Sequence, residues 1–297
     1  IYEVELLFID DKPRRIELFK EIAQLQEQRG NDQTAAFRAL SRAWSEEASE
    51  GEAREEPLYQ EMLRLAGALP CWPELVAILD KAVENSYDRE LQARVFARIA
   101  TIYDEKLEDR ERAIEAWRKV TAVHDDSQDA WQKLERLLVL SLRYGELVVV
   151  LEKLFTLCHE LPEQKRLLYH AAQLYEQVLG QPERAIATWR QVLQLDEQDG
   201  QALDALGRLY EGREAWRDLC WVYTQQIELA ESESERRPLR FAMARVYEDK
   251  LSDSFEAIGA YKGALEANER DAEAVAALAR LYEREGQWAD HLEALDK

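Results

Sequence analysis

The chain has 297 residues, of which 46% are hydrophobic, and its formal net charge is −21. Such an acidic chain is poorly suited to nucleic-acid phosphates and to anionic membrane surfaces, because both attract basic protein faces. No stretch of about 18 apolar residues occurs, which argues against a membrane-spanning helix. The 11 glycines and 7 prolines are few for this length and favour helices over the many turns of a β fold.

The chain repeats itself with a period of 72 residues. Tyr103, Tyr175 and Tyr247 follow one another at this spacing within the similar segments ATIYDEKL, AQLYEQVL and ARVYEDKL. A second set of positions keeps the same spacing through four copies: Trp72, Tyr144, Trp216 and Trp288; Leu65, Leu137, Leu209 and Leu281; Arg64, Arg136, Arg208 and Arg280. A fixed period of this kind is typical of a repeat architecture.

The period divides the chain into one array with four blocks. Residues 1–12 are expected to be the tail of a preceding repeat, and the blocks are 13–89, 90–161, 162–233 and 234–297. The first block carries about five extra residues in the polar stretch 47–56. Neither end resembles a polar capping repeat, and the last block is short. We therefore expect this sequence to be a piece of a longer array.

Each block is predicted to hold four helices. In the third block they are expected at 164–179, 182–195, 200–211 and 215–230, where apolar residues recur at helical spacing. Pro182 opens the second helix, a usual place for proline. Short polar loops make neighbouring helices antiparallel, so a block is two helical hairpins. The apolar run 147–151 is predicted to be a buried helix segment.

The hairpins resemble tetratricopeptide repeats. The segment Leu206-Gly207-Arg208-Leu209-Tyr210 matches the family's Leu-Gly-x-x-Tyr signature, and its copy at 278–282 has Ala279 in place of the glycine. In the other hairpin type, Ala172, Ala185 and Trp189 are similar to the family's small-residue and aromatic positions. The family's proline after the second helix is missing here. The resemblance implies an all-α, right-handed superhelical solenoid of stacked hairpins.

No catalytic, cofactor or metal site is predicted. Phosphate-binding glycine loops and the nucleophile-elbow pattern are absent. Cys158 and His159 are adjacent, and adjacent residues on a helix point about 100° apart, so we expect a buried thiol beside a surface histidine. The three cysteines, Cys71, Cys158 and Cys220, form no CxxC pair. They weakly favour a reducing, cytoplasmic location.

The arginine series is the main candidate for partner binding. Each arginine lies two residues before the tyrosine position on the first helix of its hairpin, and in the family that helix lines a concave groove. One interpretation is that the arginines pair with carboxylates on neighbouring helices, where a second series of acidic side chains occurs at Glu27, Asp104, Glu176 and Glu248. The other is that they bind carboxylates of a peptide. The groove candidates are Arg64, Arg136, Tyr169, Gln173, Arg208 and Arg280.

The leading hypothesis for function is a non-catalytic scaffold that binds a protein or peptide partner in this groove. The net charge favours a basic partner or serves solubility. Three alternatives remain: a regulatory array of an enzyme whose catalytic domain lies elsewhere, a helical-repeat RNA reader, and self-association through uncapped ends. The Trp72, Tyr144, Trp216 and Trp288 series is interpreted as packing rather than as an exposed aromatic stripe.

Overall fold

A computed structural model describes residues 2–6, 8–47, 52–84 and 86–288. Within these ranges every regular element is a helix, and no helix is long and apolar enough to cross a membrane. The helices are α1 Tyr2–Glu5, α2 Lys12–Gln28, α3 Gln33–Glu47, α4 Glu52–Ala68, α5 Trp72–Val83, α6 Arg89–Glu105, α7 Arg110–Val123, α8 Gln128–Leu140, α9 Tyr144–Leu157, α10 Leu161–Gln173, α11 Pro182–Leu195, α12 Gly200–Gly212, α13 Trp216–Leu229, α14 Glu233–Arg245, α15 Ser254–Ala267 and α16 Ala272–Arg284. Two five-residue π-helical segments continue α10 and α14: η1 Leu174–Val178 and η2 Val246–Lys250.

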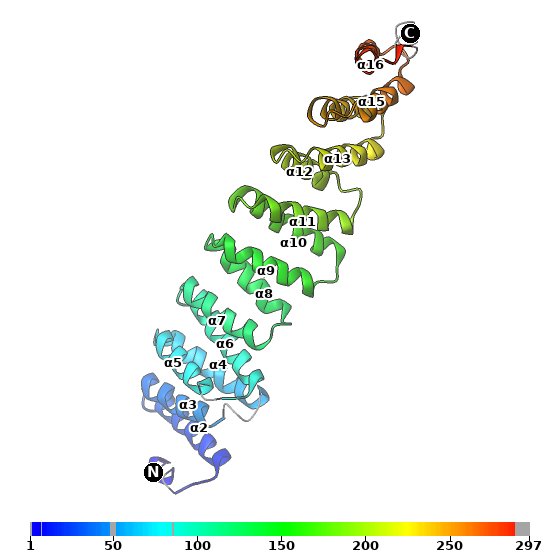
Figure 1. Ribbon diagram of the computed structural model, residues 1–297. Helices are drawn as coiled ribbons and strands as arrows, with labels where there is room; N and C mark the ends of the chain where they lie inside the picture. The colour runs from blue at the N-terminus through cyan, green and yellow to red at the C-terminus, as the bar shows by residue number, and fades with distance from the viewer. Residues whose placement is uncertain (1, 7, 48–51, 85, 289–297) are drawn as a thin grey trace. The chain divides into compact units, whose positions relative to one another are not determined.

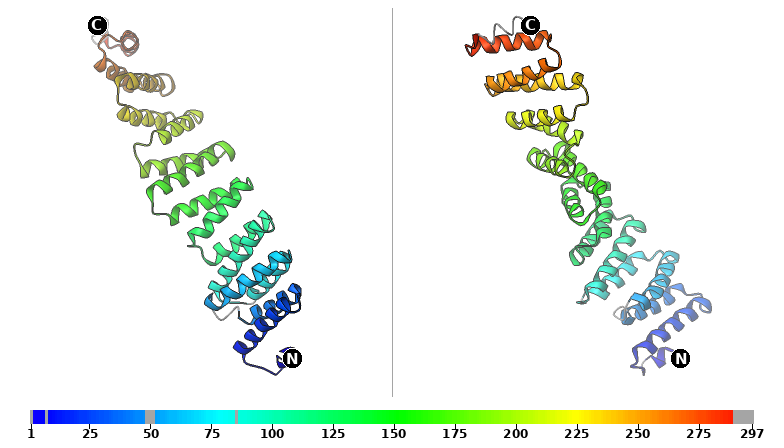
Figure 2. Two further views of the ribbon diagram at one scale, coloured as in Figure 1. Left: turned by 180° about the vertical axis from the view of Figure 1, so that it is seen from behind. Right: turned by 90° about the vertical axis from the view of Figure 1, so that its right-hand side faces the viewer.

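The chain divides into two compact units, Ile1–Leu157 and Cys158–Lys297. In the N-terminal unit the hairpins are α2/α3, α4/α5, α6/α7 and α8/α9, and each helix packs on the next one along the chain (Figure 1). In the C-terminal unit α10/α11, α12/α13 and α14/α15 do the same, and α16 packs on α15 (Figure 2). Below, the first helices are α2, α4, α6 and α8 in one unit and α10, α12, α14 and α16 in the other. The predicted all-α solenoid of stacked hairpins is confirmed.

Aromatic side chains at the repeating positions form the core of the C-terminal unit. Trp189 is 3% exposed and Tyr261, its copy 72 residues later, is 2% exposed. Each ring meets another edge-on: Tyr169 packs on Trp189 with ring centroids 5.0 Å apart, and Phe241 packs on Tyr261 at 5.3 Å. Full burial of one large apolar side chain contributes about 1.5–3 kcal/mol. These ring contacts join the two helices of one hairpin, α10 to α11 and α14 to α15.

The same backbone turn ends the first helix of successive hairpins. The residue two or three positions after the helix is in the left-handed region at Asn31, Glu108, Gly180 and Ser252 in one hairpin type, and at Leu142, Glu214 and Gly286 in the other. A backbone N–H just before or after this residue bonds back to the last turn, as in Leu179 to Leu174. Glycine occupies only two of these positions, so most of these turns have no sequence signal.

The helix boundaries predicted for the third block agree with α11, α12 and α13 to within one residue. Its first helix begins earlier than predicted, at Leu161, because Pro162 occupies the first turn, where proline is tolerated. The apolar run 147–151 is buried as predicted, except for Val149, which is 57% exposed. The extra polar stretch of the first block lies partly outside the described residues, and the helix expected after Trp288 lies wholly outside them.

Candidate functional site

The four arginines of the 72-residue series each pair with a carboxylate on the preceding first helix. Arg64 on α4 donates two hydrogen bonds to Glu27 on α2, at 2.8 and 2.7 Å. Arg136 on α8 pairs with Asp104 on α6. In the C-terminal unit, Arg208 on α12 lies 3.4 Å from Glu176 and Arg280 on α16 lies 2.9 Å from Glu248. The acidic series found in the sequence therefore supplies the carboxylate partners of the arginine series.

These ion pairs are more buried on the acidic side than on the basic side. The arginine side chains are 48% to 64% exposed from Arg64 to Arg280. Glu248, in contrast, is 9% exposed. At Glu27 the hydrogen bond from Arg64 lowers the carboxyl pKa, while burial opposes the shift. The guanidinium groups are partly occupied by these bonds and keep an exposed face toward solvent.

The π-helical segments carry two of the acidic partners. Glu176 lies in η1 and Glu248 lies in η2, at equivalent positions of successive blocks. A π-turn accommodates one more residue than an α-turn and often marks a functional position. Both carboxylates are within reach of the arginine of the next first helix, as are Glu27 and Asp104, which lie in ordinary α-helices.

Two other predicted groove residues, Tyr169 and Gln173, line one pocket on α10. The pocket has a volume of about 480 Å³, and its lining consists of Pro162, Lys165, Arg166, Tyr169, His170 and Gln173. Gln173 is exposed, and its amide has no partner among the described residues. An amide of this kind can both donate to and accept from a peptide backbone. Arg208 does not line this pocket, so the structure brings together Tyr169 and Gln173 only.

Tyr169 is held by a polar network at the start of α12. Its hydroxyl donates to Asp199, the N-cap of α12, whose carboxylate also accepts from the Ala202 N–H at 2.9 Å. Lys165 Nζ lies 2.6 Å from Asp199 and 2.9 Å from Asp196. Burial raises the pKa of Asp199, but the bonds from Lys165, Tyr169 and Ala202 outweigh it, so the net shift is downward. Burial, aided by the bond to Asp199, raises the pKa of Tyr169. Tyr169 therefore presents its ring, rather than a free hydroxyl, to the pocket.

Arg64 borders a second pocket, in the N-terminal unit. This pocket has a volume of about 530 Å³ and is lined by residues of α2, α3 and α4. Glu17, Glu21, Glu27 and Glu61 contribute carboxylates to its lining, against Lys20 and Arg64. The pocket is acidic in balance, which favours a basic ligand over an acidic one.

The aromatic series at the start of the second helices is mostly packing, as predicted. Trp72, Tyr144 and Trp216 are half-buried, and the Lys250 ammonium lies 5.0 Å from the centroid of the Trp216 ring. Trp288 is 61% exposed, at the edge of the described part of the chain.

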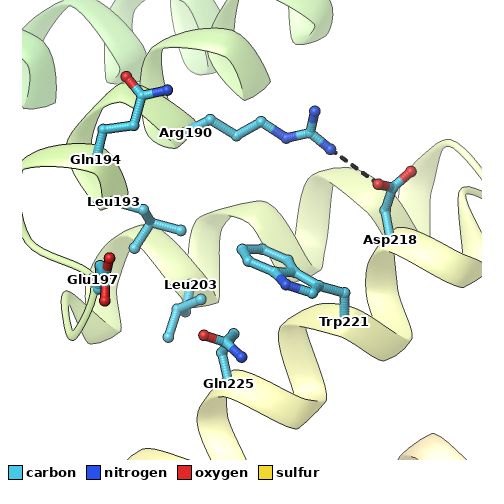
Figure 3. A pocket seen from close by; sticks show the side chains of 8 residues that line it. All are labelled: Arg190, Leu193, Gln194, Glu197, Leu203, Asp218, Trp221 and Gln225. Atoms are coloured by element: carbon cyan, nitrogen blue, oxygen red, sulfur yellow. Dashed lines mark hydrogen bonds and ion pairs between the residues drawn. The ribbon is translucent and has the colours of Figure 1, made fainter.

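Sequence reasoning missed a cavity between α11, α12 and α13, shown in Figure 3. Its volume is about 620 Å³, and most of its lining comes from the second helices α11 and α13, with Leu203 contributed by α12. Trp221 projects into it and is 43% exposed. The signal in the sequence was a departure from the repeat, because Trp221 stands where the preceding block has Val149.

The Cys158 thiol is buried and the His159 imidazole is exposed, as predicted, but the two residues lie in the loop between α9 and α10 and not on a helix. The Cys158 sulfur lies 3.7 Å from the Glu160 carbonyl. Among the described residues, no three His, Cys, Asp or Glu side chains are grouped closely enough to hold a metal ion. His291 lies outside these residues.

Two family models described as tetratricopeptide repeat match the third block, at residues 166–199 and 202–237. These ranges cover most of the α10/α11 and α12/α13 hairpins, and α12 carries the Leu-Gly-x-x-Tyr signature. The α10/α11 and α12/α13 hairpins are tetratricopeptide-like repeats. Tetratricopeptide repeats support a role as a protein–protein interaction scaffold, and the family is generally a non-enzymatic scaffold class.

Solved structures with low similarity accompany the family match. They include YrrB, described as a TPR protein with an unusual peptide-binding site, at 17% identity and a TM-score of 0.35 over 67% of this chain and 96% of that one. The MamA protein matches at 19% identity and a TM-score of 0.34 over 61% of this chain and 94% of that one. A tetratricopeptide repeat protein from Parabacteroides merdae ATCC 43184 matches at 13% identity and a TM-score of 0.35, over 90% and 98%. A comparison with curated proteins finds no match.

Proposed function

We propose that this tetratricopeptide-like array is a protein-interaction scaffold that binds an extended peptide against its first helices. The observation that carries the proposal is the pocket of about 480 Å³ on α10, where Tyr169 offers a fixed aromatic face beside the unpartnered amide of Gln173. A rigid ring and an amide that both donates and accepts suit an extended backbone and one inserted side chain.

The arginine series has a supporting role in this proposal. Arg208 and its equivalents are bound to carboxylates, yet more than half of the Arg208 side chain is exposed. A planar guanidinium with five N–H donors can keep its carboxylate and still donate to a peptide carbonyl or carboxylate. We therefore expect the arginines to orient a bound peptide rather than to provide most of its affinity.

The paired state of the arginines argues against the RNA-reader alternative. Phosphate binding requires cations whose charge is not already compensated, and affinity rises with the number of phosphates neutralised. Arg64, Arg136, Arg208 and Arg280 each have an acidic partner. With a net charge of −21, we expect no retention of the chain on RNA at low salt.

Affinity capture with the whole chain, followed by titration of the captured partner's segment, tests the proposal. We expect Gln173→Ala to weaken binding about tenfold, as for a lost hydrogen-bonding group. Gln201→Ala, at an exposed position on α12 outside the pocket lining, is the matched control. The set Arg136→Ala, Arg208→Ala and Arg280→Ala tests the arginines in the same assay. Unchanged affinity in all of these variants would exclude the first helices as the binding face.

A further inference from the structure

The cavity between α11, α12 and α13 combines an apolar floor with a polar rim. Leu203 is fully buried and Leu193 is 7% exposed, and both form the floor. Trp221 borders the opening, as Figure 3 shows. The remaining lining residues are Arg190, Gln194, Glu197, Asp218 and Gln225. A volume of about 620 Å³ is within the range of ligand-binding pockets in proteins.

One side of the rim is already neutralised. Arg190 donates to Asp218 at 2.9 Å, and its Nε donates to the Tyr210 hydroxyl at 2.6 Å. Both bonds hold the guanidinium at the edge of the cavity. Glu197, on the opposite side, has no hydrogen-bond or ion-pair partner among the described residues. The cavity therefore carries one uncompensated negative charge.

The preceding block shows which residues occupy the equivalent position there. At a distance of 72 residues, Asp125 corresponds to Glu197 and Lys153 corresponds to Gln225. There Lys153 Nζ lies 3.2 Å from the Asp125 carboxylate. In the third block the glutamine cannot supply that cation, and Gln225 instead lies 3.4 Å from Glu228. The third block therefore keeps an acidic residue at this position, Glu197, but lacks the cation that pairs with it in the preceding block.

The apolar residues at this position also differ between the two blocks, in a way that favours an open cavity in the third. Trp131 occupies the place of Leu203 in the preceding block, and its indole N–H donates to the Asp125 carbonyl at 2.9 Å. Replacement of this large ring by leucine leaves space, and the tryptophan of the third block is instead Trp221, at the rim. An exposed tryptophan face beside a carboxylate is a favourable environment for a cation.

We propose that this cavity is a docking site for a basic peptide segment of another protein, with an arginine side chain seated between Trp221 and Glu197. Arginine fits better than lysine, because its planar guanidinium can stack on an indole and donate two bonds to one carboxylate. Its aliphatic stem would lie on Leu193 and Leu203. The net charge of −21 would draw a basic segment toward this face. This site shares no lining residue with the pocket on α10, so the two proposals can be tested independently.

The test uses the whole chain and acetylated, amidated octapeptides of alanine and serine that differ only at one central residue: arginine, lysine or glutamate. Binding is followed by NMR through the Trp221 indole signal, which is assigned with Trp221→Phe. We expect the arginine peptide to bind, the lysine peptide to bind more weakly and the glutamate peptide not to bind. The affinity of the arginine peptide should fall as salt screens the charges.

Gln225→Lys is the decisive variant, because it restores the cation that Lys153 provides in the preceding block. We expect it to lower the affinity for the arginine peptide about tenfold, and we expect Glu197→Gln to do the same. Lys153→Gln is the matched control and should leave the affinity unchanged, as should Gln173→Ala. Helical content measured by circular dichroism should be the same in all variants. The proposal is overturned if the arginine peptide does not bind at millimolar concentration, if it binds no better than the glutamate peptide, or if Gln225→Lys binds it as tightly as the wild type.

Discussion

Arg280 on α16 donates to the carboxylate of Glu248 at 2.9 Å, across from one first helix to the next. The two residues are separated by 32 positions in sequence, and the same relation recurs between Arg208 and Glu176 in the preceding block. Arg284 also approaches Glu248, at 3.8 Å. The repeat therefore contains a recurring ion pair rather than a single binding residue. This ion pair joins the first helices of two successive hairpins.

The first prediction concerns the stability of this pair. Arg280→Ala should lower the free energy of unfolding by less than about 1 kcal/mol, because the guanidinium is 64% exposed and Arg284 remains near Glu248. Urea denaturation of Arg280→Ala, Glu248→Ala and the double variant gives the coupling energy. A coupling well above about 1 kcal/mol would show that the pair is a main support of the stack and not a surface ion pair.

Much of the fold could be predicted because repetition averages out local ambiguity. The helix starting at Pro182 was located correctly from a proline in the first turn and an apolar face that recurs in other blocks. The π-segments were not predictable, because η1 and η2 have the same apolar pattern as an ordinary helix end.

The candidate site could be predicted only in part. The sequence showed an arginine series and an acidic series, but whether Arg136 faces Asp104 or solvent depends on side-chain reach between separate helices. The cavity at Trp221 was missed for a different reason. A search for repeats emphasises what the blocks share, whereas this cavity arises at Gln225 and Leu203, where one block differs from its predecessor.

A second prediction follows from the left-handed turns. Leu142 has φ of 55° and is 67% exposed, so its side chain gains little from burial while its backbone is unfavourable. Leu142→Gly should stabilise the protein by about 1 kcal/mol, because glycine adopts this conformation without steric cost. Thermal unfolding would show an increase in Tm.

The reverse substitution provides the control. Gly180 has φ of 59°, and a Cβ added there would meet nothing within 4 Å. Gly180→Ala should therefore destabilise by about 1 kcal/mol through the backbone alone. If Leu142→Gly lowers Tm while Gly180→Ala has no effect, the left-handed turns do not limit stability.

A third prediction concerns acid. The bond from Arg237 lowers the pKa of Asp271 below its usual value, while burial opposes the shift. A carboxyl group with a lowered folded-state pKa binds more protons in the unfolded chain at mildly acidic pH. Its stabilising contribution is therefore present above the unfolded pKa, about 3.9, and is lost as pH falls through the folded value.

Asp271→Asn separates this charge from helix capping. Asparagine still caps a helix well, so the bonds to the N–H groups of Glu273 and Ala274 should survive. We expect the variant to lose about 1–2 kcal/mol at pH 7 and progressively less as pH falls below the unfolded pKa, so that its unfolding free energy depends less on pH than that of the wild type. Urea denaturation from pH 7 to pH 3 measures this, and parallel curves for the two proteins would refute it.

The last prediction concerns the glycine of the Leu-Gly-x-x-Tyr signature. Gly207 lies inside α12, and a Cβ there would be 3.7 Å from Val222 Cγ1 and 4.0 Å from Leu219 Cδ1, which are ordinary contact distances. The next block has Ala279 at the same position, 7% exposed in α16. Because alanine favours a helix interior over glycine, Gly207→Ala should stabilise the protein by about 0.5–1 kcal/mol. The opposite change, Ala279→Gly, should cost a similar amount in the same urea titration. A loss of stability in Gly207→Ala would mean that α12 and α13 pack too closely for a methyl group, and that the glycine of the signature is required for packing in this block.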